Sequence, residues 1–186
     1  MKKLVTYCLL SVAFLLLFHS KTYAHELFIQ VKENHDNNEY QIDVLWGHLR
    51  DFLDRANYED YELYVRTPSG EVEQLPLEGI GVQARAFLTP SEQGLYTLWA
   101  IRNPGTYSPS EDLSILIKQM AKSIFHVGDV HEVVHEPTDL LLEIIPNDPL
   151  NEIRNDDFSG TVYYEGEVAP SIQVSAYGPD GEVFET

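Results

Sequence analysis

The chain has 186 residues and a formal net charge of −18, from 12 basic and 30 acidic residues. This acidity argues against nucleic acid as a partner, because phosphate binding requires clustered lysine and arginine. The single cysteine, Cys8, lies in an apolar N-terminal run, so the rest of the chain can form no disulfide, thiolate metal site or cysteine nucleophile.

The first 24 residues have the pattern of an export signal. Lys2 and Lys3 precede an apolar run over residues 4–18, and residues 22–24 place small side chains at positions −3 and −1 of a cleavage site. The run is shorter than the roughly 20 residues that a membrane helix needs. We predict cleavage after Ala24, which removes three lysines and no acidic residue and leaves a periplasmic or extracellular protein of net charge −21.

Cleavage at this point makes His25 the first residue of the mature chain. A free N-terminal histidine offers an amine and an imidazole nitrogen from one residue, which is a chelate for copper, nickel, cobalt or zinc. The alternative is that His25 follows the cleavage site by chance, since any residue can stand there.

Short alternating stretches rich in Tyr, Val, Ile and Phe, separated by turn signals, predict strands in the first two thirds of the chain. The expected strands span residues 27–31, 40–46, 61–66, 71–75, 82–88 and 95–101. Many short strands at this spacing predict an immunoglobulin-like β-sandwich, here over residues 25–128.

One helix is expected within this all-β domain. Leu113, Leu116, Ile117 and Met120 follow one another at helical spacing, and Ser110 stands in the N-cap position. We therefore predict a short helix over residues 110–122 that runs into a strand at 123–127.

Residues 129–138 form a polar connector to a second, small β-domain at 139–186. Strands are expected at 140–145, 158–164 and 171–177, followed by a tight turn into 183–184. About four strands are few for a closed sandwich. The second domain is therefore expected to be truncated, or to complete its sheet with another chain and form an oligomer through that edge.

His48 follows Gly47 at the end of an aromatic strand, where a glycine allows close approach of backbone or ligand. If the first two strands are neighbours, His48 can reach His25. Two imidazoles and the free amine would then form a three-nitrogen histidine brace. The competing interpretation is an ordinary strand-end histidine.

Three further histidines are candidate ligands. His131, Glu132 and His135 match the HExxH pattern, in which a helix places both imidazoles on one face beside a general base. Gly128 and Pro137 leave room for little more than two turns, so we expect a connector that contributes metal ligands, or a solvated linker, rather than a zinc protease. His126 is either a further ligand or a solvent-facing strand residue.

Several motifs occur in an order that resembles a known family. They are Ala24-His25-Glu26 before an aromatic strand, Gly47-His48, an Ala121-Lys122 strand ending in Val127-Gly128, Leu142–Pro146 with Asp148-Pro149, and Gly166–Pro170. Their order resembles the exported bacterial domain-of-unknown-function family found beside nickel and cobalt transporters of the energy-coupling-factor type. Members of that family continue through more strands at the C-terminus than this chain does.

The resemblance implies a non-enzymatic accessory protein that binds a divalent transition metal and passes it to a membrane importer. Nickel or cobalt is the implied metal, with copper or zinc as alternatives, and His25 and His48 are the implied ligands. Two other classes remain open from the residues alone. One is a copper oxygenase that uses the same brace, and the other is an adhesion or carbohydrate-binding sandwich in which the histidines have no role.

Overall fold

The computed structural model describes residues 25–34, 38–48, 52–55, 57–129, 135–147, 158–177 and 183–185. Within them the chain is almost entirely β-structure, with a single 3-10 turn, η1 (Tyr58–Asp60). The strands are β1 (Glu26–Asn34), β2 (Glu39–Gly47), β3 (Tyr61–Arg66), β4 (Val72–Leu75), β5 (Glu78–Ile80), β6 (Gln83–Leu88), β7 (Gly94–Ser110), β8 (Leu113–Val127), β9 (Leu142–Pro146), β10 (Gly160–Tyr164), β11 (Glu167–Val168), β12 (Ser175–Tyr177) and β13 (Val183–Glu185).

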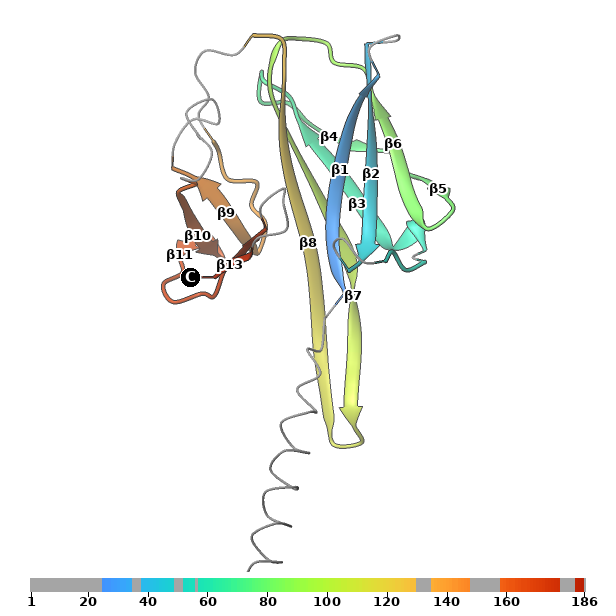
Figure 1. The fold of residues 1–186 in the computed structure, drawn as a ribbon, viewed down its shortest axis with the longest axis vertical. Coiled ribbons are helices and arrows are strands. Elements are labelled where there is room, and N and C mark those ends of the chain that lie inside the picture. The colour runs from blue at the N-terminus through green and yellow to red at the C-terminus, as the bar shows by residue number, and fades with distance from the viewer. Residues whose placement is uncertain are drawn as a thin grey trace, which may run out of the picture.

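Two four-stranded antiparallel sheets form the larger part of the molecule (Figure 1). One has the order β1-β2-β6-β5 and the other β4-β3-β7-β8, with β1 lying beside β8. Alternate residues of each strand face inward, as the two-residue period of a strand requires. Ile42, Leu63, Val65 and Leu98 are almost completely buried between the sheets. The predicted all-β sandwich is confirmed.

The predicted helix over residues 110–122 is wrong. Residues 113–127 form β8, and Ser110 pairs with Leu113 at the turn of a hairpin instead of capping a helix. The apolar residues that gave helical spacing belong to a run that also contains Ile115, a β-branched residue favoured in strands. Pairing with β7, for example Thr106 opposite Leu116, overrides the local helical pattern.

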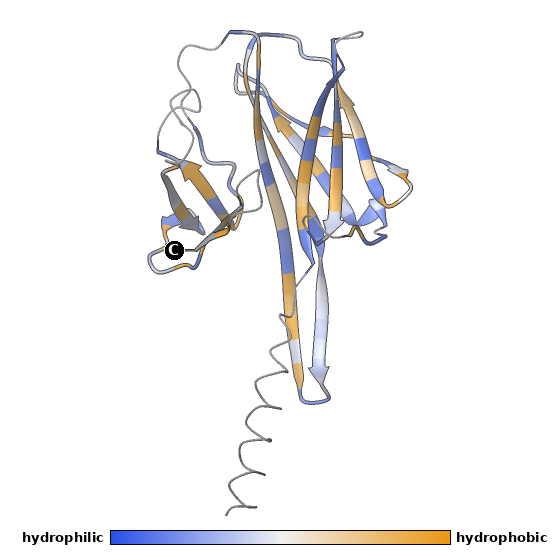
Figure 2. Ribbon diagram, in the orientation of Figure 1, coloured by the Kyte–Doolittle hydropathy of each residue, from blue (hydrophilic) through white to orange (hydrophobic). Residues whose placement is uncertain are grey.

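The β7–β8 hairpin extends beyond the two sheets as an arm, defined here as residues 103–118 (Figure 1). Pairing of β3 with β7 ends at Arg102, and a register irregularity follows between Arg102 and Gly105. Apolar side chains of the arm face solvent: Leu116 is 61% exposed and Tyr107 56%. Figure 2 shows hydrophobic residues concentrated on the β8 side of the arm.

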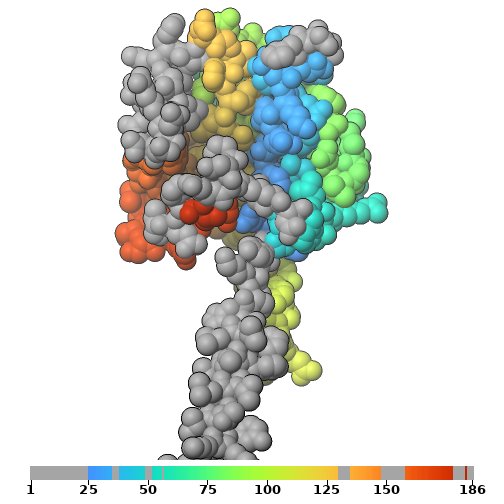
Figure 3. Space-filling view, in the orientation of Figure 1, coloured from blue at the N-terminus to red at the C-terminus, as the bar shows by residue number. Residues whose placement is uncertain are grey.

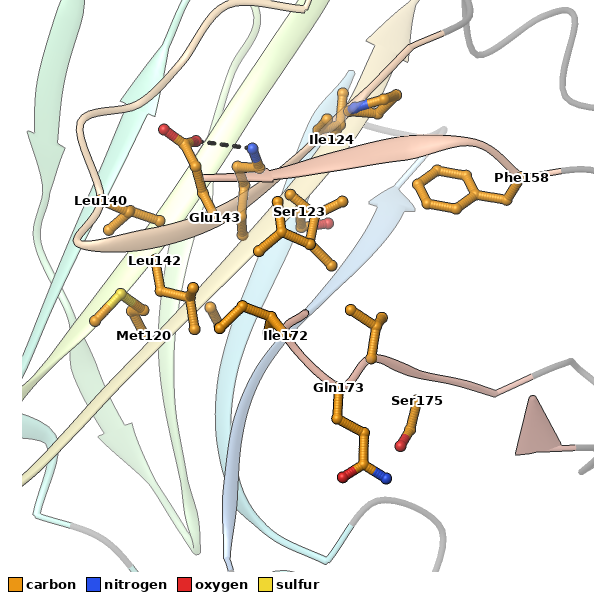
Figure 4. Close-up of a pocket in the computed structure, with 16 residues that line it drawn as sticks. Met120, Ser123, Ile124, Leu140, Leu142, Glu143, Phe158, Ile172, Gln173 and Ser175 are labelled. Carbon is orange, nitrogen blue, oxygen red and sulfur yellow. Dashed lines mark hydrogen bonds and ion pairs between the residues drawn. The ribbon is translucent and has the colours of Figure 1, made fainter. Parts of the chain in front are cut away.

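The C-terminal strands form a separate group beside the sandwich (Figure 3). The last sandwich strand, β8, ends at Val127, and the first C-terminal strand, β9, begins at Leu142. The predicted connector lies between them in the sequence. The C-terminal strands form the sheet β11-β10-β9 and the pair β12-β13. A hollow of about 710 Å³ lies between β8 and these strands, with apolar walls that include Met120, Leu142 and Ile172 (Figure 4).

A buried ion pair joins β8 to β9 at this hollow (Figure 4). Lys122 Nζ donates to Glu143 Oε2 at 2.9 Å, and the side chain of Glu143 is only 3% exposed. The backbone N–H and the hydroxyl of Thr138 also donate to this carboxylate. Burial by itself would raise the pKa of Glu143, but these hydrogen bonds and the charge of Lys122 outweigh it and lower the pKa.

The part of the chain that the structure describes holds no helix long and apolar enough to cross a membrane.

The first prediction concerns Asp43, a buried carboxylate on the face of β2 opposite to the core residues Ile42 and Val44. Arg85 of β6 donates to both of its oxygens, at 2.6 and 3.1 Å, and Gln41 donates to Oδ2 at 2.7 Å. Asp43→Ala leaves the guanidinium group without its counter-charge. We expect the free energy of unfolding in urea to fall by about 3–5 kcal/mol.

The control for this variant is Tyr64→Phe, which removes an exposed hydrogen bond to Glu62. Surface changes of this kind cost about 0.5 kcal/mol or less. Equal losses in the two variants would contradict the structural role of the buried pair.

The second prediction concerns the pH dependence of the Lys122–Glu143 pair. Because the folded state lowers the pKa of Glu143 below its ordinary value of 4.5, the pair stabilises the fold above that pH. This contribution is lost as the pH falls through the folded-state pKa. Urea unfolding from pH 7 to pH 3 should show a steeper loss of stability for the native chain than for Glu143→Gln. Parallel profiles would show that the pair makes no pH-dependent contribution.

Candidate metal site at the start of β1

The register of the first two strands brings His25 and His48 together. Glu26 pairs with Gly47, so each histidine stands one residue beyond the same end of the β1–β2 ladder. Their ring centroids are 4.7 Å apart, with an angle of 55° between the rings. The first two strands are neighbours, which is the condition under which the sequence predicts that His48 can reach His25.

Gly47 is the last residue of β2, and residues 52–54 lie against its backbone. Its φ of +151° lies in a region that L side chains rarely adopt, and a Cβ there would lie 2.4 Å from the carbonyl oxygen of Phe52. The N–H of His48 donates to that same oxygen, and the N–H of Asp54 donates to the carbonyl of Trp46, each at 2.9 Å. The chain therefore folds back across the end of β2 and returns to the histidine pair.

This return places Asp54 against His25. Asp54 Oδ2 is hydrogen-bonded to His25 Nε2, and the two side chains are 46% and 31% exposed. Sequence reasoning missed Asp54, because it belongs to no spaced motif. Gly47 signalled a close approach of backbone at this point, but a glycine does not show which later residue the approach brings in.

The ring and backbone of His25 are also held from the sandwich. The imidazole stacks on Trp46 with centroids 4.3 Å apart, and the guanidinium of Arg102 lies 4.2 Å from the indole ring. Gln119 of β8 accepts hydrogen bonds from Trp46 Nε1 and Arg102 Nη1, at 3.1 and 2.9 Å. Its amide nitrogen donates to the carbonyl oxygen of His25 at 2.6 Å.

Side chains alone do not complete a metal site here. Among the described residues, no three His, Cys, Asp or Glu side chains are arranged so that they could hold a metal ion. The two imidazoles of His25 and His48 supply two nitrogen donors. A third donor at this position would be the α-amine of His25, which the predicted cleavage after Ala24 releases.

The other candidate ligands lie apart from this pair. His126 is exposed on β8, opposite Leu95. It follows Gln119, the residue bonded to His25, by seven positions, which is about 23 Å along a strand. The structure therefore does not bring His126 to His25 and His48.

His135, the last residue of the HExxH pattern, lies in an irregular stretch rather than in a helix. Its ring nitrogens are both buried, and neither has a hydrogen-bond partner in the portion of the chain that is described. Burial, and to a smaller degree the charge of Lys122, lowers the pKa of His135. His131 and Glu132 lie outside the described residues, so their proposed roles stay predictions.

The fold and the site together define an all-β sandwich protein with two histidines just beyond one end of the β1–β2 strand pair. The chain belongs to the family described as Domain of unknown function (DUF4198), whose model matches residues 22–185. Neither a curated protein nor a solved structure matches the chain. The family match carries no link to nickel or cobalt transporters.

The third prediction tests the turn at Gly47. Gly47→Ala forces the new Cβ against backbone atoms of Phe52 and Leu53, at 2.4 and 2.8 Å, so the returning segment must shift. We expect a loss of about 2 kcal/mol or more in the free energy of unfolding. The aromatic circular dichroism from Trp46 should also change.

The matched control is Gly70→Ala, which shares a positive φ of +90° but has open space around the added Cβ. The loss of stability in Gly70→Ala reports the cost of placing alanine at a positive φ without a steric clash. Any larger loss in Gly47→Ala then reports the clash. A Gly47→Ala variant no less stable than Gly70→Ala would show that residues 52–54 are not packed against the end of β2.

Proposed function

We propose that this protein is an exported, non-enzymatic carrier that binds one divalent transition-metal ion, nickel or cobalt, and delivers it to a membrane importer. The observation that supports this proposal best is the adjacency of the His25 and His48 rings at the point where the predicted mature chain begins. The family resemblance in the order of the sequence motifs supports it as well.

The donor set suits a metal of intermediate softness. The chain beyond residue 24 has no cysteine, so the ligands at this end are nitrogen and oxygen atoms. Imidazole and amine nitrogens bind nickel, cobalt, copper and zinc in preference to magnesium or calcium. The chemistry of the ligands therefore selects this group of ions, and the supply of metal decides among its members.

The exposure of the site suits transfer of the ion. The side chain of His25 is 31% exposed and that of the neighbouring Asp54 is 46% exposed, so solvent reaches His25 and Asp54. Two imidazoles and one amine leave coordination positions for water or for a ligand from a partner. The net charge of the chain also raises the local concentration of cations around the protein.

The fourth prediction is tight binding of one ion at this site. Nickel, cobalt, copper or zinc is titrated by calorimetry into protein whose first residue is confirmed as His25. We expect one-to-one binding that weakens by more than about 100-fold in His48→Ala, because a direct ligand contributes at least as much as the residues that orient it. Adding one glycine before His25 should weaken binding similarly, since it converts the amine to an amide.

His126→Ala is the matched control, because it removes an exposed histidine far from the pair. Binding no tighter in the native chain than in His48→Ala would reject the proposal and leave the adhesion or carbohydrate-binding class. Tight copper binding with substrate oxidation in the presence of a reductant would favour the oxygenase instead.

A further inference from the structure

The two nitrogens of an imidazole are not equivalent once one of them is hydrogen-bonded. In neutral histidine one nitrogen carries the proton and the other offers a lone pair, and the hydrogen bond determines which is which. His25 Nε2 faces Asp54 Oδ2, and an ionised carboxylate only accepts hydrogen bonds. The proton of His25 therefore belongs on Nε2, and the lone pair on Nδ1.

Nδ1 is also the only ring nitrogen that can share a metal with the α-amine of the same residue. Chelation through the amine and Nδ1 closes a six-membered ring with the metal. Nε2 lies on the far side of the imidazole and cannot close such a ring. The contact with Asp54 thus occupies the nitrogen that the chelate does not use.

Asp54 and His25 are positioned by the same residue. The N–H of Asp54 donates to the carbonyl of Trp46, and the His25 ring stacks on the Trp46 indole. Gln119 fixes the carbonyl of His25 from the other sheet. The Trp46 stack and the Gln119 hydrogen bond already hold the His25 ring in place. The hydrogen bond to Asp54 therefore determines which ring nitrogen carries the proton, and it is not needed to pack the ring.

The absence of any three metal-holding side chains in the described residues agrees with this arrangement. Asp54 lies next to the His25 imidazole, and its oxygen is directed at Nε2 of that ring. Asp54 contacts the ring nitrogen of His25 that does not bind the metal, as do the carboxylates that orient metal-bound histidines in other proteins.

From these contacts we propose that Asp54 is a positioning residue that holds the proton of His25 on Nε2 and so commits Nδ1 and the α-amine to the metal. This inference rests on the metal-binding function proposed above. It adds a residue to the site and specifies the coordination mode of His25.

The fifth prediction is tested by ¹⁵N chemical shifts of the His25 ring, in protein that begins at His25, with and without Zn²⁺. In the native chain we expect the Nε2–H tautomer without metal and coordination through Nδ1 with zinc. Asp54→Ala should give a mixture of tautomers without metal and bind zinc about 10–100-fold more weakly. Asp54→Asn should preserve the tautomer, because its amide oxygen still accepts from Nε2, and should lose less affinity.

Glu73→Gln controls for the loss of one negative charge, since Glu73 is exposed on β4, at the opposite edge of its sheet from β8. It should change neither the tautomer nor the affinity. A backbone spectrum of Asp54→Ala that matches the native one outside the site shows that the variant is folded.

Coordination of zinc through Nε2, or a His25 tautomer that is unchanged in Asp54→Ala, overturns the role of Asp54 while the carrier function stands. If the native chain binds none of nickel, cobalt, copper and zinc, the carrier function and this inference are rejected together. The two failures are therefore distinguishable.

Discussion

The antiparallel register of β1 and β2 determines the geometry of the candidate site. With Glu26 opposite Gly47, His25 and His48 extend from the same end of two hydrogen-bonded strands. A shift of one residue would turn every side chain of β1 to the other face, exposing core residues such as Leu27. Burial of the sandwich core therefore stabilises the β1–β2 register. The contact between His25 and His48 depends on that register.

The second sheet completes the site through β8. Gln119 reaches across to the carbonyl of His25 and to the indole of Trp46, while Arg102 from the adjacent β7 covers the indole face. The first residue of the predicted mature chain would otherwise be a freely moving terminus. Contacts from both sheets restrict it, so less conformational entropy remains to be lost when the ligands gather around an ion.

Local patterns in the sequence were sufficient for the sandwich, because alternation and turn residues mark where strands begin and end. They gave the meeting of His25 with His48 only on the condition that the first two strands are neighbours. They failed for β8, where helical spacing and strand pairing are compatible with the same apolar run. They also missed Asp54 and the Lys122–Glu143 pair, since these contacts join segments without a shared motif. Such contacts depend on how the chain returns after Gly47 and on where β9 lies against β8.

The continuous strands β7 and β8 have one part inside the sandwich and one part in the arm. Residues 94–102 are paired with β8 and in part with β3, whereas residues beyond Gly105 have only their hairpin partner in the described chain. Amide hydrogens in the arm can exchange with solvent by local fraying, while those at Leu98 require the core to open. Arg102 and Gln119 stand at the boundary between these two regimes. The residues that hold His25 are therefore the first at which exchange should become slow.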